Sequence, residues 1–168
     1  MRSLKWSTSH AVFVTEIDDD HNAIFQALSA VRQAIGGAGS PAEISKLLQD
    51  LVSRISEHFA HEERLMRAAR YGSLRWHKTA HDQARKRVLH FVQRREHGDA
   101  AAGVELVEHL SAWLSDHVGV ADRMLGAFLR NHDRFMCKVT FRAGTRPVDS
   151  CAWVTATGET FDPGSDDI

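Results

Sequence analysis

Hydrophobic residues recur every three or four positions through the first 130 residues, which is the period of helices with one buried face. The pattern predicts helices at about residues 19–36, 41–68, 74–97 and 100–130. In the first of these, the apolar stripe consists of Ile24, Phe25, Leu28, Val31 and Ile35. Short connections make successive helices antiparallel neighbours, so we expect an all-α, up-down-up-down four-helix bundle.

The helix ends carry recognisable signals. Ser40-Pro41-Ala42-Glu43 is a capping-box sequence with proline at the first helical position. Residues 131–168 hold two of the three prolines and show no helical stripe. We therefore expect a bundle domain at 1–130 and a non-helical extension at 131–168, with segments 137–141 and 151–155 either short strands or disordered. This extension is a candidate contact for a protein partner, and the oligomeric state is left open.

Composition narrows the class of protein. The 168 residues are 43% hydrophobic and 26% charged, with a net charge of −1, as in globular domains. Lys and Arg are not in excess, which argues against nucleic acid as a partner. No apolar run is long enough for a membrane span or a signal peptide. Cys137 and Cys151 form no C-x-x-C pair, so we expect free thiols and a cytoplasmic location.

Eleven residues are histidine, and some of them recur at helical spacings. His58 and Glu62 are four apart, as are His77 and His81, so each pair shares a helix face. In an up-down-up-down bundle, seven candidate ligands fall at one end. They are His21, His58, Glu62, His77, His81, His117 and Asp122. The other histidines, His10, His61, His90, His97, His109 and His132, are expected to have no role.

Five imidazoles and two carboxylates are too many donors for one metal ion, and they suit two. Carboxylates can bridge a pair of ions, and this donor set favours iron, zinc or copper over magnesium or calcium. His117 and Asp122 are five apart, about 140° from each other on an ideal helix. Either Asp122 reaches in from the flank, or a π-bulge, eased by Gly119, brings it round. Glu63, Asp82 and Asp116 adjoin candidate ligands and could support them as hydrogen-bond partners, but we favour solvated faces for all three.

These residues resemble the hemerythrins, and the bacterial hemerythrins in particular, over about residues 4–130. The matching text is Trp6, Ile17-Asp18, His21, His58-Phe59-x-x-Glu62-Glu63-x-Leu65-Met66, His77-x-x-x-His81 and Trp113-Leu114-x-x-His117-Val118-x-x-x-Asp122. The resemblance implies a non-haem di-iron site that binds O2 reversibly, with Glu62, Asp122 and an oxo or hydroxo group as bridges. It also implies one iron on His58, His77 and His81, with His21 and His117 as outer imidazoles and His117 on the iron open to O2.

Apolar residues flank the candidate ligands. Phe59, Trp113, Leu114 and Val118 are expected to line an O2 pocket, and no residue is assigned a catalytic role. The leading hypothesis is therefore O2 carriage, storage or delivery. A sensor of O2, NO or redox state could use the same site. A di-iron oxidase or peroxidase is disfavoured because the chain has no Glu-x-x-His motif, and His-Glu-x-x-His of zinc hydrolases is absent as well.

Overall fold

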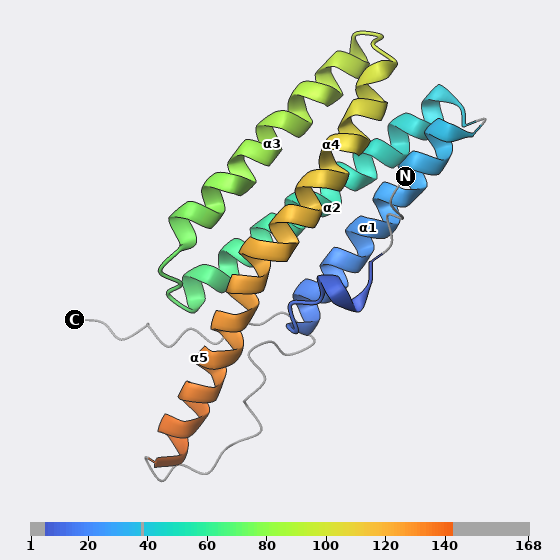
Figure 1. The fold of residues 1–168 in the computed structure, drawn as a ribbon. Coiled ribbons are helices and arrows are strands. Elements are labelled where there is room, and N and C mark those ends of the chain that lie inside the picture. Colours follow the sequence, from blue (N-terminus) through green and yellow to red (C-terminus); the bar gives the residue numbers. More distant parts are fainter. Residues whose placement is uncertain (1–5, 38, 143–168) are drawn as a thin grey trace. The chain divides into compact units, whose positions relative to one another are not determined.

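The structure, a computed structural model, describes residues 6–37 and 39–142, with side chains as far as residue 132. After a 3-10 helix, η1 (Thr8–His10), come four long helices: α1 (Thr15–Gly36), α2 (Pro41–Ala68), α3 (Leu74–Glu96) and α4 (Ala101–His117). A π-helical turn, η2 (Val118–Asp122), then joins α4 to α5 (Arg123–Arg142) without a break (Figure 1). The described residues include no strand.

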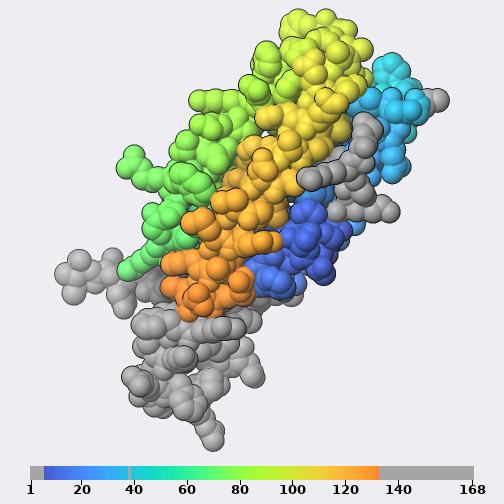
Figure 2. Space-filling model, in the orientation of Figure 1, coloured from blue at the N-terminus to red at the C-terminus, as the bar shows by residue number. Residues whose placement is uncertain are grey.

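The long helices form the expected bundle. Each of α1 to α4 packs against two neighbours, in the ring α1–α2–α3–α4, and successive helices run in opposite directions (Figure 1). In the view of Figure 2, α4, in yellow and orange, lies between α3, in green, and the beginning of α1, in blue. The prediction of an all-α, up-down-up-down bundle is confirmed.

The interior contains two apolar clusters with a polar layer between them. The larger cluster includes Ile24 of α1, Phe59 of α2 and Leu114 of α4, and the smaller includes Ile17 and Met66. On α1, the buried His21 lies between Ile17 of the smaller cluster and Ile24 of the larger. On α2, the buried Glu62 likewise lies between Phe59 and Met66. Each fully buried aliphatic or aromatic side chain contributes about 1.5–3 kcal/mol. The bundle can therefore keep a polar layer away from water because apolar packing covers it on both sides.

The helix ends follow local chemistry. Ser40 Oγ accepts a hydrogen bond from the backbone N–H of Glu43 at 3.2 Å, with Pro41 in the first turn, as predicted. The first long helix, α1, begins at Thr15, four residues earlier than predicted. The reason is Asp18, whose carboxylate accepts hydrogen bonds from the N–H groups of Val12 and Phe13 at 2.8 and 3.0 Å. This aspartate lies inside the helix and ties down the preceding segment.

The C-terminal prediction needs correction. We expected the last helix to end near residue 130 and residues 137–141 to be a short strand or disordered, but α5 continues to Arg142. Residues 131–142 contain neither glycine nor proline, and nothing in them stops a helix that is already formed. The chain divides into two compact units, Met1–Leu129 and Arg130–Ile168, and the bundle belongs to the first. Residues 151–155, expected to be a short strand or disordered, lie outside the described residues. The prediction of free thiols at Cys137 and Cys151 falls on side chains that are likewise not described.

Among the described residues, no helix combines the length and the apolar character that crossing a membrane requires.

Candidate metal centre

The seven side chains singled out from the sequence meet in the polar layer of the bundle. None of them is more than 7% exposed, and five have no exposed surface at all. They come from four directions: His21 from α1, His58 and Glu62 from α2, His77 and His81 from α3, and His117 with Asp122 from the end of α4 and η2. Their donor atoms form two groups that share both carboxylates.

The first group contains three imidazoles. Nε2 of His117 lies 3.1 Å from Nε2 of His77 and 3.1 Å from Nε2 of His81. Oε2 of Glu62 is 3.2 Å from Nε2 of both His77 and His81, and Oδ1 of Asp122 is 3.0 Å from Nε2 of His117. Two donors held about 2.1 Å from one ion at a right angle are about 3.0 Å apart. The five atoms are therefore close enough together to bind a single metal ion.

The second group contains two imidazoles. Nε2 of His21 lies 3.1 Å from Oδ2 of Asp122, and Nε2 of His58 lies 3.7 Å from Oε2 of Glu62. Asp122 thus presents one oxygen to each group, which is the arrangement of a bridging carboxylate. Glu62 also belongs to both groups. Of the two shared carboxylates, one comes from the α1–α2 hairpin and the other from the end of the α3–α4 hairpin.

The expected division of the histidines is wrong. The resemblance suggested His58 with His77 and His81, and His117 with His21. In the structure His58 stands beside His21, with ring centroids 4.7 Å apart, and His117 contacts His77 and His81. Each group follows one helical hairpin, because antiparallel neighbours bring their side chains to the same point. Sequence spacing predicts the level of a side chain in the bundle, but it does not predict which neighbours it faces.

The polar atoms of this layer fit bound cations. Both oxygens of Glu62, both oxygens of Asp122 and both ring nitrogens of His21 are buried without a hydrogen-bond partner. A buried polar group left unpaired costs about 1–3 kcal/mol, and more when it is charged. Two carboxylates and five imidazoles also form the mixed oxygen and nitrogen set that transition metals prefer. The residues present therefore fit a pair of metal ions.

The pKa shifts of the buried carboxylates also favour bound cations. Burial raises the pKa of Asp122, but the adjacent imidazoles of His117, His21 and His77 outweigh it and hold the pKa well below 3.8. Burial and Asp122 raise the pKa of Glu62, while His58, His77 and His81 lower it, to about 2. Both carboxylates are consequently anionic at neutral pH. Burial lowers the pKa of His77, but Asp122 and Glu62 raise it to about 9. In the absence of metal, this imidazole is therefore protonated at neutral pH and pairs with the two carboxylates.

The π-helical turn explains the five-residue spacing of His117 and Asp122. The hypothesis of a π-bulge is confirmed, since η2 covers Val118–Asp122 and brings the two side chains within 3.0 Å. The suggested part of Gly119 is not supported. A Cβ at this glycine would meet nothing within 4 Å, and its backbone is not left-handed. The turn therefore does not depend on glycine.

Two aromatic rings cover the three-histidine group. Phe59 stacks on His81, with centroids 4.0 Å apart and the planes within 9°, and Trp113 stacks on His117 at 4.2 Å and 16°. Leu114 and Val118 are buried in the clusters on either side. All four residues expected in an O2 pocket thus surround the centre, two of them directly against its imidazoles.

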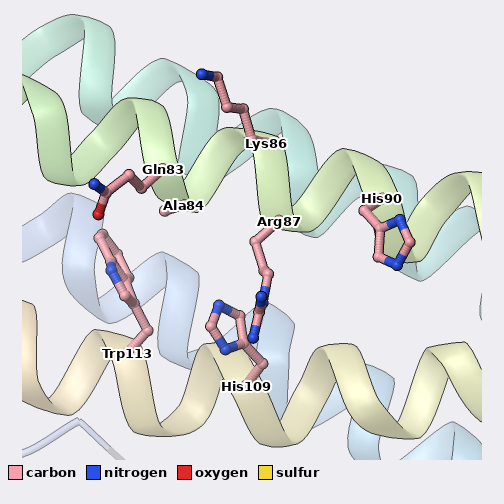
Figure 3. Close-up of a pocket in the computed structure, with 7 residues that line it drawn as sticks. All are labelled: Gln83, Ala84, Lys86, Arg87, His90, His109 and Trp113. Atoms are coloured by element: carbon pink, nitrogen blue, oxygen red, sulfur yellow. The ribbon is translucent and has the colours of Figure 1, made fainter.

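A surface groove between α3 and α4 is separate from the centre. Its volume is about 520 Å³, and in Figure 3 the side chain of Arg87 lies beside His109. Trp113 forms one wall, so the indole that stacks on His117 also reaches the groove. None of the seven candidate ligands lines it. The groove is therefore distinct from the candidate metal centre.

Two further carboxylates lie behind the candidate ligands, and sequence reasoning had preferred a solvated face for Glu63 and had not considered Asp20. Glu63 was expected in solvent but is 6% exposed, and its Oε1 lies 3.5 Å from Nδ1 of His81. Asp20 lies 3.6 Å from Nδ1 of His58 and 2.8 Å from His61. Asp82 and Asp116 are solvated, as expected. A signal for Glu63 was available, because it follows Phe59 by four positions on the buried face of α2.

Known proteins match this chain across the whole bundle. The family model of the hemerythrin HHE cation binding domain matches residues 12–129, which include all seven candidate ligands. A bacteriohemerythrin of Ralstonia nicotianae is 31% identical over 129 residues, covering 77% of this chain and 90% of the relative. A hemerythrin subunit of Sipunculus nudus is 33% identical over 117 residues, covering 70% and 86%. A bacteriohemerythrin of Methylococcus capsulatus is 28% identical over 133 residues, covering 77% and 98%.

Proposed function

This chain belongs to the hemerythrin family, and from that premise we propose that its buried cluster holds two iron ions and binds dioxygen reversibly, for carriage, storage or delivery. The observation that carries the proposal is the sharing of Glu62 and Asp122 between two groups of imidazoles. A pair of carboxylates common to both groups holds two ions close enough to act on one small molecule.

We propose that His77, His81 and His117 hold one ion and that His21 and His58 hold the other. With the two carboxylates, the first group offers five protein donors and the second offers four. The two-histidine side is therefore the side with more room for an external ligand. When bound, two ferrous ions supply the two electrons that dioxygen accepts reversibly.

The rest of the layer controls access and charge. Phe59, Leu114 and Val118 are at most 1% exposed, so they keep bulk water from the imidazoles. The ionised Glu62 and Asp122 offset the charge of the cations in an interior where an unpaired charge is costly. We propose that this apolar, water-poor surrounding favours binding and release over turnover, and hence that the protein is not an enzyme.

The test is an absorption spectrum of the iron-loaded protein in air, after oxygen removal and after oxygen return. The proposal expects a charge-transfer band that disappears and returns over repeated cycles. His77→Ala should lose the band, whereas His90→Ala, a histidine in the surface groove, should keep it. Irreversible oxidation, or steady consumption of an added reductant with dioxygen, would refute reversible binding and favour an enzyme.

A further inference from the structure

The imidazole of His81 is contacted on its face and at both of its ring nitrogens. Phe59 stacks on its face at 4.0 Å, and its Nε2 approaches Glu62 at 3.2 Å. Its Nδ1 is buried and makes no hydrogen bond, and Oε1 of Glu63 lies 3.5 Å from it. The far side of this ring thus faces a carboxylate that is not itself one of the seven candidate ligands.

Glu63 is in turn fixed by two arginines. Arg85 donates from Nη2 to Oε1 at 3.0 Å, and Arg67 donates from Nη2 to Oε2 at 3.1 Å. The guanidinium of Arg85 also lies over the ring of Phe59, 5.0 Å from its centroid. Arg85 therefore contacts both of the groups that hold His81, the stacked ring and the carboxylate.

The two-histidine group has a similar arrangement. Oδ2 of Asp20 lies 3.6 Å from Nδ1 of His58, which is also buried without a hydrogen bond. In each group, one histidine is backed by a carboxylate from the preceding helix, Asp20 on α1 behind His58 and Glu63 on α2 behind His81. The recurrence in both groups argues against a chance contact.

We propose that Glu63, anchored by Arg85, is a positioning residue that accepts the Nδ1–H of His81 and so directs a bare, more basic Nε2 toward the metal. A hydrogen bond to the second ring nitrogen fixes the tautomer of a metal-binding histidine and strengthens it as a donor. This inference rests on the proposed function, because it concerns an ion bound at His81.

Cobalt(II) alone, added to the metal-free full chain, provides the probe. Glu63→Leu removes the acceptor, and Glu63→Gln keeps an amide oxygen but loses the charge. The matched control is Asp82→Asn. Asp82 also binds Arg85, at 2.9 Å, but it is partly exposed and follows His81 by one residue. We expect cobalt affinity to fall about 10- to 100-fold in Glu63→Leu and less in Glu63→Gln, with no change in the control.

A second readout separates positioning from general damage. In the cobalt-loaded protein, the solvent-exchangeable Nδ1–H resonance of His81 should shift and exchange faster in both Glu63 variants, and keep its position in Asp82→Asn. Thermal unfolding of each metal-free variant shows whether it folds. If the Glu63 variants match the unmodified protein in affinity and resonance, or if Asp82→Asn has equal effects, the positioning role is wrong. If the unmodified protein binds no cobalt, the proposed metal site itself fails.

Discussion

Oδ2 of Asp122 lies 3.1 Å from Nε2 of His21, which joins the first long helix to the π-helical turn near the end of the bundle. The other oxygen of the same carboxylate faces Nε2 of His77 at 3.1 Å and Nε2 of His117 at 3.0 Å. Under the proposed assignment, Asp122 would hold two ions together, whereas each histidine would bind one. This difference makes the metal count of single variants informative.

Replacing a shared carboxylate should cost more metal than replacing a histidine. We expect Asp122→Ala to lose both ions and His21→Ala to lose only the ion of the two-histidine group. Glu57→Ala is the control, since Glu57 is on α2 but exposed and hydrogen-bonded to Ser53. The iron content per chain, measured after gel filtration, distinguishes the loss of one ion from the loss of two. Equal losses in Asp122→Ala and His21→Ala would contradict the bridging role.

Removing the metal should destabilise the fold. A ligand that binds only the folded state adds stability by mass action, and chelation also removes the cations that offset the buried charges of Glu62 and Asp122. We expect a lower melting temperature after chelation, restored by ferrous iron added without oxygen. The variant His77→Ala should show a smaller difference between the two states. A chelated protein that melts at the same temperature as the loaded one argues against a buried metal pair.

The metal-free protein should lose stability as the solution becomes alkaline. The pKa of His77 is raised from 6.5 to about 9 in the fold, because Asp122 and Glu62 outweigh its burial. The contribution of the protonated imidazole is therefore fully present below pH 6.5 and lost as the pH rises through 9. Thermal melts of the chelated protein between about pH 6 and 10 test this. A melting temperature that is flat or rises over that interval contradicts it.

Two glycines should respond to alanine in opposite ways. Gly98, after α3, has a φ of 91°, a left-handed conformation that costs an alanine about 1–2 kcal/mol. Gly119, in η2, has a right-handed backbone and open space at its Cβ, so alanine there should stabilise by about 0.5–1 kcal/mol. Denaturant unfolding of both variants measures the two signs. Gly119→Ala should also retain its iron, and loss of iron would show that the turn needs glycine after all.

Shortening an apolar side chain of the larger cluster should lower the stability of the fold more than it lowers metal binding. Leu110 is fully buried in the larger cluster, and its replacement by alanine is expected to cost about 2–5 kcal/mol in the free energy of unfolding. Leu89, which is 56% exposed, is the matched control and should change little. At saturating iron, folded Leu110→Ala should still bind the metal. If both leucines cost the same, the described core is wrong.

Much of this architecture could be predicted from periodicity. The four helices and the level of the candidate ligands followed from apolar residues at helical spacing, and the π-turn followed from the five-residue gap between His117 and Asp122. Such features depend on positions along one helix, which the sequence states directly. The grouping of His58 with His21 depends instead on which helices are neighbours and how each is rotated.

Other features escaped prediction for related reasons. Glu63 is charged and therefore expected in solvent, but Arg85 and Arg67 pair with it where it is buried, and such pairing is not visible in a linear pattern. The continuation of α5 to Arg142 escaped because Val139 and Thr140 favour strands, whereas a formed helix propagates cheaply unless glycine or proline stops it. In both cases a tertiary partner or a preceding helix outweighed the local preference.

A shared two-iron centre that binds dioxygen reversibly can be tested by measuring iron and dioxygen stoichiometry together on the unmodified protein. We expect two iron ions per chain, with one dioxygen taken up by the reduced form and recovered when oxygen is removed under vacuum. Two ions are required because the two groups of imidazoles share Glu62 and Asp122. A saturating value of one ion per chain, or dioxygen that is consumed and cannot be recovered, would contradict such a centre.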